Sequence, residues 1–117
     1  MKIQVNAVAS YKGHNVGNNG QIRLKMAMGY DEIVNAIELL QFLGNNIDVK
    51  TRLQGDVKGS KIGSFTLHHV AIDHDGESTI TLLSMTDYVE IQNINDLIQQ
   101  KFKVRFEADI ENEEEDD

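Results

Sequence analysis

The sequence predicts a mainly β domain with one clear helix, an α+β chain whose strands form an antiparallel sheet or a small barrel. Three observations support this prediction. Many short segments alternate apolar and polar residues, only one long segment has helical spacing, and nothing supplies the strand–helix alternation of a parallel sheet. The 117 residues suit one domain, and the absence of proline leaves the turns to glycine, asparagine and aspartate.

Period-two alternation predicts six strands, at residues 2–11, 21–28, 46–54, 62–72, 78–84 and 102–110. In the fourth strand two faces compete for the core: either Phe65, Leu67 and His69, or His68, Val70 and Ile72. Residues 12–20, rich in glycine and asparagine, predict a loop, and residues 55–61 predict a turn. The Asp75-Gly76 pair within residues 73–77 predicts a hairpin, and residues 88–91 predict a short extended piece.

One segment has the spacing of a helix. Asp31 is the expected N-cap, apolar residues recur at three- and four-residue intervals up to about Leu43, and Gly44 suits the left-handed position that ends a helix. A second, brief helix is expected from Asn93 or Asn95 through Gln100. The predicted order is therefore β-β-α-β-β-β-α-β, with no internal repeat and no second domain.

Charge divides the chain into a body and a tail. The formal net charge is −8, but residues 111–117 hold six acids and no base, residues 1–110 carry −2, and residues 1–72 alone carry +3. We therefore expect one domain at residues 1–110 and a disordered acidic tail at residues 111–117. The tail either keeps the protein in solution or competes for a basic face and recruits partner proteins.

Three predicted strands each carry two cations two residues apart, which places both on one face. These pairs are Arg23 with Lys25, Lys50 with Arg52, and Lys103 with Arg105. If the strands are neighbours, the six cations line one surface that can neutralise phosphates. The alternative is an ordinary solvated strand face. Among the aromatic residues, Tyr11 and Tyr88 are the rings most expected to be exposed, and exposed rings can stack on bases.

No residue pattern indicates catalysis, so we expect no catalytic residues, no cofactor and no enzyme activity. The sequence lacks a phosphate-binding glycine loop and a nucleophile elbow. The Asp73-x-Asp75-x-Glu77 run fails the calcium-loop pattern, and the adjacent His68 and His69 point to opposite faces of a strand, so we expect no metal site. There is no signal-peptide pattern and no membrane-length apolar run, and the chain lacks cysteine, so we expect no membrane contact and a cytoplasmic location.

The stretch from Ile22 to Gly44, the strand through Lys50 and Arg52, and the tail Glu-Asn-Glu-Glu-Glu-Asp-Asp resemble single-stranded DNA-binding proteins of phages that infect lactococci and related low-GC bacteria. The resemblance implies an OB-type β-barrel, a homodimer, and binding of single strands in phage DNA replication or recombination inside the bacterial host. It also allows phage or host recombination and replication proteins as partners. This sequence departs from the usual OB order because its clear helix follows the second strand, and its tail lacks an apolar tip.

On this reading, phosphates are contacted by Lys12, Arg23, Lys25, Lys50, Arg52 and Lys61, and bases stack on Tyr11 and Tyr88. The loop at residues 12–20 would close over the strand. Two other functions remain open. The acidic C-terminal third suits a phage inhibitor that binds proteins, such as an anti-defence or DNA-mimic protein, and the small size also suits a structural phage subunit.

Overall fold

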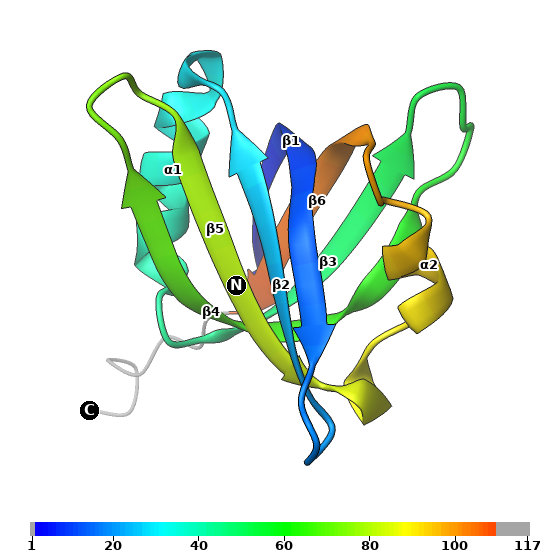
Figure 1. Ribbon diagram of the computed structural model, residues 1–117. Coiled ribbons are helices and arrows are strands. Elements are labelled where there is room, and N and C mark those ends of the chain that lie inside the picture. The colour runs from blue at the N-terminus through cyan, green and yellow to red at the C-terminus, as the bar shows by residue number, and fades with distance from the viewer. Residues whose placement is uncertain (1, 110–117) are drawn as a thin grey trace.

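The computed structural model describes residues 2–109; the acidic tail, with its predicted disorder, and Ile110 lie outside the described residues. Six antiparallel strands form a sheet that closes on itself in the order β1-β2-β5-β4-β3-β6, with β6 paired to β1 (Figure 1). The strands are β1 Lys2–Val16, β2 Gln21–Met28, β3 Asn46–Leu53, β4 Ser60–Ile72, β5 Ser78–Met85 and β6 Lys101–Asp109. The predicted mainly β, antiparallel architecture with one clear helix is confirmed.

Alternation along the strands builds one core inside the barrel. In β2 the residues alternate between exposed and buried from Gln21 to Met26, and β6 alternates in the same way from Lys101 to Phe106. Side chains from every strand meet in this core, and Phe65 and Phe106 are among its largest fully buried members. Polar side chains of the same strands consequently point outward, which places the strand cations on the outer surface of the barrel.

Two helices contact β4 at opposite ends. α1, Ile33–Leu39, is extended by 3-10 turns at Tyr30–Glu32 and Leu40–Phe42 and buries Ala36, Leu39 and Phe42. Just beyond it, the Gly44 N–H donates to the Leu67 carbonyl. α2, Ile91–Asn95, lies at the start of β4, where the Glu90 N–H donates to the Ile62 carbonyl. Figure 1 shows the two helices on opposite sides of the barrel.

The predicted helix boundaries are partly right. Gly44 has the expected left-handed conformation, with φ of +81°. Asp31, however, lies within the 3-10 turn and makes no capping hydrogen bond, so its assignment as N-cap is wrong. The chain already turns after Gly29, which is extended, and this earlier turn takes Asp31 inside the helical segment. The second helix begins at Ile91, earlier than predicted, and ends at Asn95.

The predicted loop at residues 12–20 is mostly strand. β1 continues to Val16 and pairs with β2 up to the Val16–Ile22 pair, which leaves a tight turn at residues 17–20. Gly13, with φ of +133°, sits at an irregularity in the β1–β2 register instead of in a loop. Glycine there serves a bulge, a role that composition alone does not distinguish from a loop. The long loop that would close over a bound strand is therefore absent from residues 2–109.

A second irregularity decides the face of β4. Phe65 and Leu67 are buried, but the register with β5 shifts between Leu67 and His69. His68 and His69 are consequently both exposed, and neither of the two predicted inward faces holds along the whole strand. Among the described residues, no helix is long and apolar enough to cross a membrane.

Candidate functional site: a cationic face on β3 and β6

Four strand cations come together because β3 and β6 are neighbours. In their ladder Lys50 lies opposite Arg105, and Arg52 lies opposite Lys103. Neighbouring strands lie roughly 4.8 Å apart and alternate residues on a strand roughly 6.7 Å apart, so the four residues form a compact rectangle. We call these four residues the cationic face. Lys50, Lys103 and Arg105 are exposed and Arg52 is half-buried.

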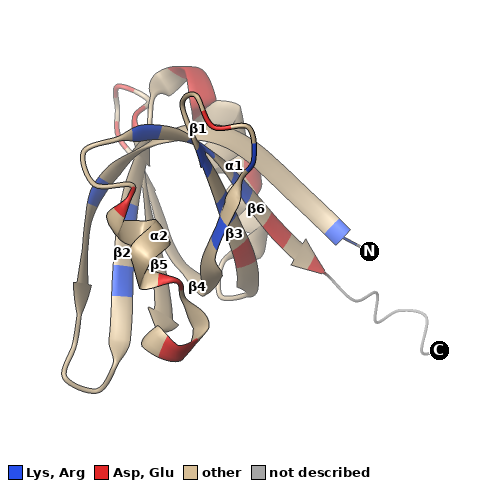
Figure 2. Cartoon of the chain, turned by 90° about the vertical axis from the view of Figure 1, so that its right-hand side faces the viewer, with Lys and Arg blue, Asp and Glu red and all other residues tan. Residues whose placement is uncertain are grey.

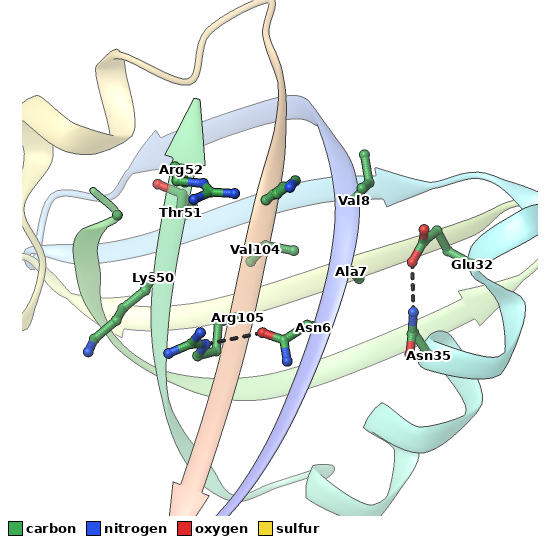
Figure 3. Close-up of a pocket in the computed structure, with 12 residues that line it drawn as sticks. Asn6, Ala7, Val8, Glu32, Asn35, Lys50, Thr51, Arg52, Val104 and Arg105 are labelled. Atoms are coloured by element: carbon green, nitrogen blue, oxygen red, sulfur yellow. Dashed lines mark hydrogen bonds between the residues drawn. The ribbon is translucent and has the colours of Figure 1, made fainter. Parts of the chain in front are cut away.

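The cationic face borders a hollow of about 630 Å³ on the outside of the barrel. β1 contributes Asn6, Ala7 and Val8 to its wall, and Glu32 and Asn35 close it from the side of α1 (Figure 3). The Asn35 amide donates to the Glu32 carboxylate over 2.7 Å. A neighbouring hollow of about 430 Å³ is lined by Arg52, Lys103 and Lys101 together with residues 53–56. Lys101 therefore adds a fifth cation next to the rectangle, and the carboxylate of Asp56 lines the same hollow.

Most of this positive charge has no counter-charge in the described part of the chain. Lys50, Arg52 and Lys103 make no ion pair and no side-chain hydrogen bond with any residue from 2 to 109. Arg105 is the exception, because its Nε donates to Asn6 Oδ1 over 3.1 Å and its Nη1 lies 3.9 Å from Glu107 Oε2. These two contacts hold the Arg105 side chain over β6 and β1.

The arrangement works against folding stability. Like charges directly opposite one another across a ladder are destabilising, whereas opposite charges contribute roughly 0.2–1 kcal/mol. The Lys50–Arg105 and Arg52–Lys103 pairs both break this rule, and Lys50 also lies opposite Lys61 on its other side. A bound anion would attract each of these cations and so offset the repulsion between them.

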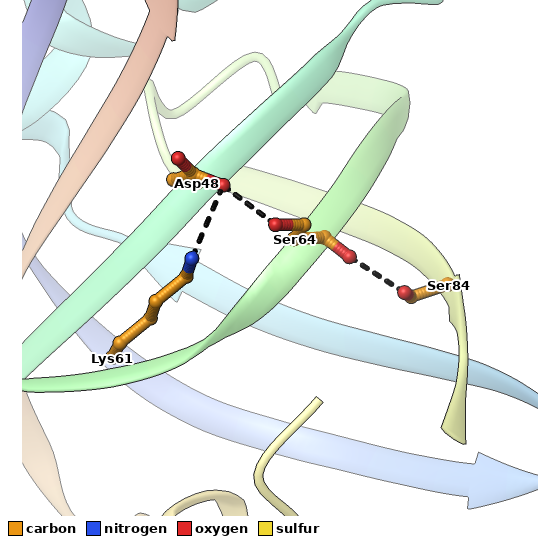
Figure 4. Close-up of polar contacts among 4 residues, drawn as sticks. All are labelled: Asp48, Lys61, Ser64 and Ser84. Carbon is orange, nitrogen blue, oxygen red and sulfur yellow. Dashed lines mark hydrogen bonds and ion pairs between the residues drawn. The ribbon is translucent and has the colours of Figure 1, made fainter. Parts of the chain in front are cut away.

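Lys61 is engaged by a neighbouring polar strip on β3, β4 and β5. Lys61 Nζ lies 3.7 Å from Asp48 Oδ1, which also accepts a hydrogen bond of 2.6 Å from the Ser64 hydroxyl (Figure 4). The Ser84 hydroxyl in turn donates to the Ser64 carbonyl over 2.6 Å. Asp48 therefore marks the acidic margin of the cationic face, and Lys61 is partly neutralised there.

Arg23 and Lys25 do not join the other four cations. They lie on β2, which pairs with β1 and β5 and has no ladder with β3 or β6. Figure 2 shows the basic segments of β2 well separated from those of β3 and β6. The expected surface of six strand cations is thus a surface of four. Lys12 lines a small hollow with Lys101, and the carboxylates of Asp31, Glu32 and Glu77 share that hollow.

The two tyrosines selected from the sequence differ in exposure. Tyr11 is half-buried against the core, and its hydroxyl lies 2.6 Å from His14 Nδ1, so its ring is not a free platform. Tyr88 is exposed at 66%. It lines a groove whose wall also includes Asp48 and Glu107, and it does not line the hollow beside the cationic face.

Sequence reasoning singled out Lys103 and Arg105 as a strand pair but left them out of the expected binding set, and the structure makes them half of the cationic face. The sequence already indicated that both side chains point outward, since they alternate with Phe102, Val104 and Phe106, which are buried. Their partner strand was not evident, because β3 and β6 are far apart in the chain. Asn6, which accepts from Arg105, carried no signal of its own.

Within residues 2–109, no group of three or more histidine, aspartate or glutamate residues is arranged to hold a metal ion. No protein-family model matches the chain, and neither the curated proteins nor the solved structures include a significant match.

Proposed function

We propose that this protein binds single-stranded DNA through its phosphate backbone, along the cationic face of β3 and β6. The observation that carries the proposal is the pair of like-charge oppositions, Lys50 with Arg105 and Arg52 with Lys103. Such pairs cost stability in the free protein and are relieved by a polyanion. A single phosphate neutralises one or two of these charges, whereas a strand of linked phosphates reaches all four.

The shape of the face favours a flexible strand over a duplex. The four cations lie on barrel strands, and no helix or two-stranded ribbon projects from between them to enter a major groove. A flexible chain of phosphates can follow the two rows of cations and continue toward Lys101. Duplex DNA of the same length has fixed phosphate positions and would engage fewer of them.

The chemistry of the face favours binding that is independent of base sequence. Lysine and arginine lie around the main hollow, and none of its lining residues is aromatic. Phosphate contacts position a nucleic acid without reading its bases. Of the two tyrosines expected to stack on bases, only Tyr88 has an exposed ring, and it lies in the groove that contains Asp48.

The finer parts of the proposal rest on the sequence resemblance. These are an OB-type barrel, a role in phage DNA replication or recombination, and action inside the bacterial host. The OB fold is a five-stranded barrel, whereas this barrel has six strands and carries α1 between β2 and β3. The binding face does not depend on that assignment.

The direct test is a titration of fluorescent oligo-dT with the protein at about 50 and 200 mM salt. Three or four neutralised phosphates, at a slope of about −0.7 each, predict a roughly 20- to 50-fold loss of affinity between these conditions. A duplex of equal length should bind more weakly at both. Absence of any complex at micromolar protein and the lower salt concentration would refute the proposal.

A further inference from the structure

The hollow beside the cationic face has a second wall of different chemistry. Glu32, the last residue of the 3-10 turn before α1, is half-buried, and its carboxylate makes no capping hydrogen bond to the helix. It makes no ion pair with any residue from 2 to 109 either. The Asn35 amide donates to Oε1 of Glu32 and holds the carboxylate in place. Its other oxygen can therefore accept a hydrogen bond from a ligand in the hollow.

The strand registers place neutral residues between the cations and this carboxylate. In the β1–β6 ladder Asn6 lies opposite Arg105, and Val8 lies opposite Lys103. Two rows therefore cross the sheet from β3 through β6 to β1, and each row contains two cations followed by a neutral side chain. At roughly 4.8 Å between strands, each row spans about 10 Å. Figure 3 shows Glu32 beyond Val8, on the side of the hollow away from β3.

This layout suits a ligand with negative charges at one end and hydrogen-bond donors at the other. A carboxylate repels phosphates, so Glu32 adds nothing to phosphate binding, but it can accept hydrogen bonds from two adjacent hydroxyl groups. Ribose presents such a pair, and acidic side chains bind the ribose 2′ hydroxyl in dinucleotide-binding sites. The hollow of about 630 Å³ also lies within the roughly 300–1,000 Å³ of sites that hold small ligands.

The charge density of the cationic face favours a triphosphate at the other end of this ligand. A terminal phosphate carries roughly 1.5 to 2 negative charges near pH 7 and each inner phosphate carries one, so a nucleoside triphosphate carries about four. Four cations in a compact rectangle match this number. The phosphates of a triphosphate share bridging oxygens, whereas those of DNA are separated by a sugar. A triphosphate therefore concentrates its charge over the rectangle more closely than a DNA strand does.

We propose that the hollow beside the cationic face binds a ribonucleoside triphosphate, with the triphosphate on the four cations and the ribose hydroxyls on Glu32. Val8, between the two, offers an apolar contact to the sugar. None of the residues that line the hollow is aromatic, so the base has no stacking platform there. The nucleotide and a DNA strand would need the same cations, so each would exclude the other. Only this competition rests on the proposed function.

The first experiment measures the binding of ATP and dideoxy-ATP to the protein by calorimetry at about 50 mM salt. The two nucleotides have the same base and the same triphosphate, but dideoxy-ATP lacks both ribose hydroxyls. Mg²⁺ is left out because it binds the phosphates and would compete with the cations. We expect ATP to bind about tenfold more tightly or better, because its hydroxyls donate to a charged acceptor. Equal affinities, or no ATP binding below about 1 mM, would overturn the proposal.

The second experiment removes the carboxylate. Glu32→Ala should abolish the preference for ATP over dideoxy-ATP, and dideoxy-ATP should bind at least as tightly as before, since a negative charge is lost from the hollow. The matched control is Glu38→Ala, which removes an exposed carboxylate of α1 that does not line the hollow. It should keep the preference for ATP. A Glu32→Ala protein that retains the preference would contradict the proposal, as would one that loses affinity equally for both nucleotides.

The third experiment adds ATP to the complex of the protein with fluorescent oligo-dT. We expect ATP to displace the oligonucleotide with an inhibition constant equal to its calorimetric dissociation constant. ATP that binds without displacing oligo-dT would lie away from the cationic face, against the proposal. A protein that binds oligo-dT but does not distinguish ATP from dideoxy-ATP would refute this inference alone. A protein that prefers ATP but does not bind oligo-dT would refute the proposed function alone.

Discussion

Lys50 of β3 and Arg105 of β6 lie directly opposite each other in the ladder that joins the two strands, and Arg105 is held there by Asn6 of β1. Asn6 is uncharged, so it orients the guanidinium without neutralising it, and the one carboxylate paired with Arg105 among residues 2–109, that of Glu107, lies at 3.9 Å. Arg105 is therefore held in place next to a cation that repels it. This repulsion lowers folding stability but favours anion binding, so one substitution here should change the free energy of unfolding and the DNA affinity in opposite directions.

Replacing Lys50 with glutamate should change stability and binding in opposite directions. The new carboxylate would face Arg105 and Lys61, so we expect the free energy of unfolding to rise by roughly 0.2–1 kcal/mol. Oligo-dT affinity should fall at least about tenfold, because a cation becomes an anion in the centre of the face. Thermal melting and fluorescence anisotropy on the same sample measure both effects.

Lys25→Glu is the matched control for this variant. It makes the same charge change at an exposed position on β2, opposite Gly13 and Thr81. We expect less than about a twofold change in affinity, which surface charges at a distance produce through screened interactions. If Lys25→Glu weakened binding as much as Lys50→Glu, the bound strand would have to cross β2 as well.

Replacing Asp48 with asparagine should strengthen DNA binding. The carboxylate engages Lys61 at 3.7 Å, and the asparagine oxygen can still accept the hydrogen bond from Ser64. Freeing Lys61 and removing a negative charge beside Lys50 should raise oligo-dT affinity about two- to fivefold at low salt. The gain should shrink as salt is added. Asp87→Asn, in the 3-10 turn before Val89, is the control and should leave the affinity unchanged.

Replacing Tyr88 with alanine separates stacking from phosphate binding. A ring that stacks on a base contributes about 1–3 kcal/mol, whereas the cationic face alone predicts no loss. Because Tyr88 shares its groove with the carboxylates of Asp48 and Glu107, we expect less than about a threefold loss of affinity for oligo-dT. Oligo-dT and mixed-sequence oligonucleotides of equal length should also bind within that factor. A loss of tenfold or more would show that the strand passes over the acidic margin.

Gly63 should be the glycine of β4 that tolerates no side chain. Its φ is +149°, and a Cβ there would lie 2.7 Å from the Tyr88 carbonyl oxygen and 2.8 Å from Val89. Gly63→Ala should therefore lower the free energy of unfolding by about 1–3 kcal/mol or more. Gly55→Ala, at positive φ but in open space, should cost only about 1 kcal/mol. Equal melting temperatures for the two variants would contradict the close contact.

The local pattern predicted the strands because burial enforces a period of two. Phe102, Val104 and Phe106 had to face one way for any core to form, and this fixed the outward direction of Lys103 and Arg105. The order of the strands around the barrel could not be predicted from the alternation of side chains within each strand. Pairing of β3 with β6 depends on the closure of the whole sheet, and that closure decided which cations became neighbours.

Backbone irregularities account for the other differences. The bulge at Gly13 let β1 run on to Val16, and the register shift after Leu67 exposed two histidines. Both depend on how a strand meets its partner and not on side-chain periodicity. The ring of Tyr11 was expected to be exposed because it borders a glycine-rich segment. That segment belongs to β1, and its His14 forms a hydrogen bond with the Tyr11 hydroxyl.

Closure of the sheet has a consequence for how this protein can associate. Every described strand is hydrogen-bonded to a neighbour on each side, so no strand offers a complete row of unpaired backbone groups. Association by addition of a strand, the route that leads from exposed edges to fibrils, is thereby disfavoured. Within residues 2–109, copies of the chain brought close together on a polymer therefore present few strand edges along which β-aggregates could form.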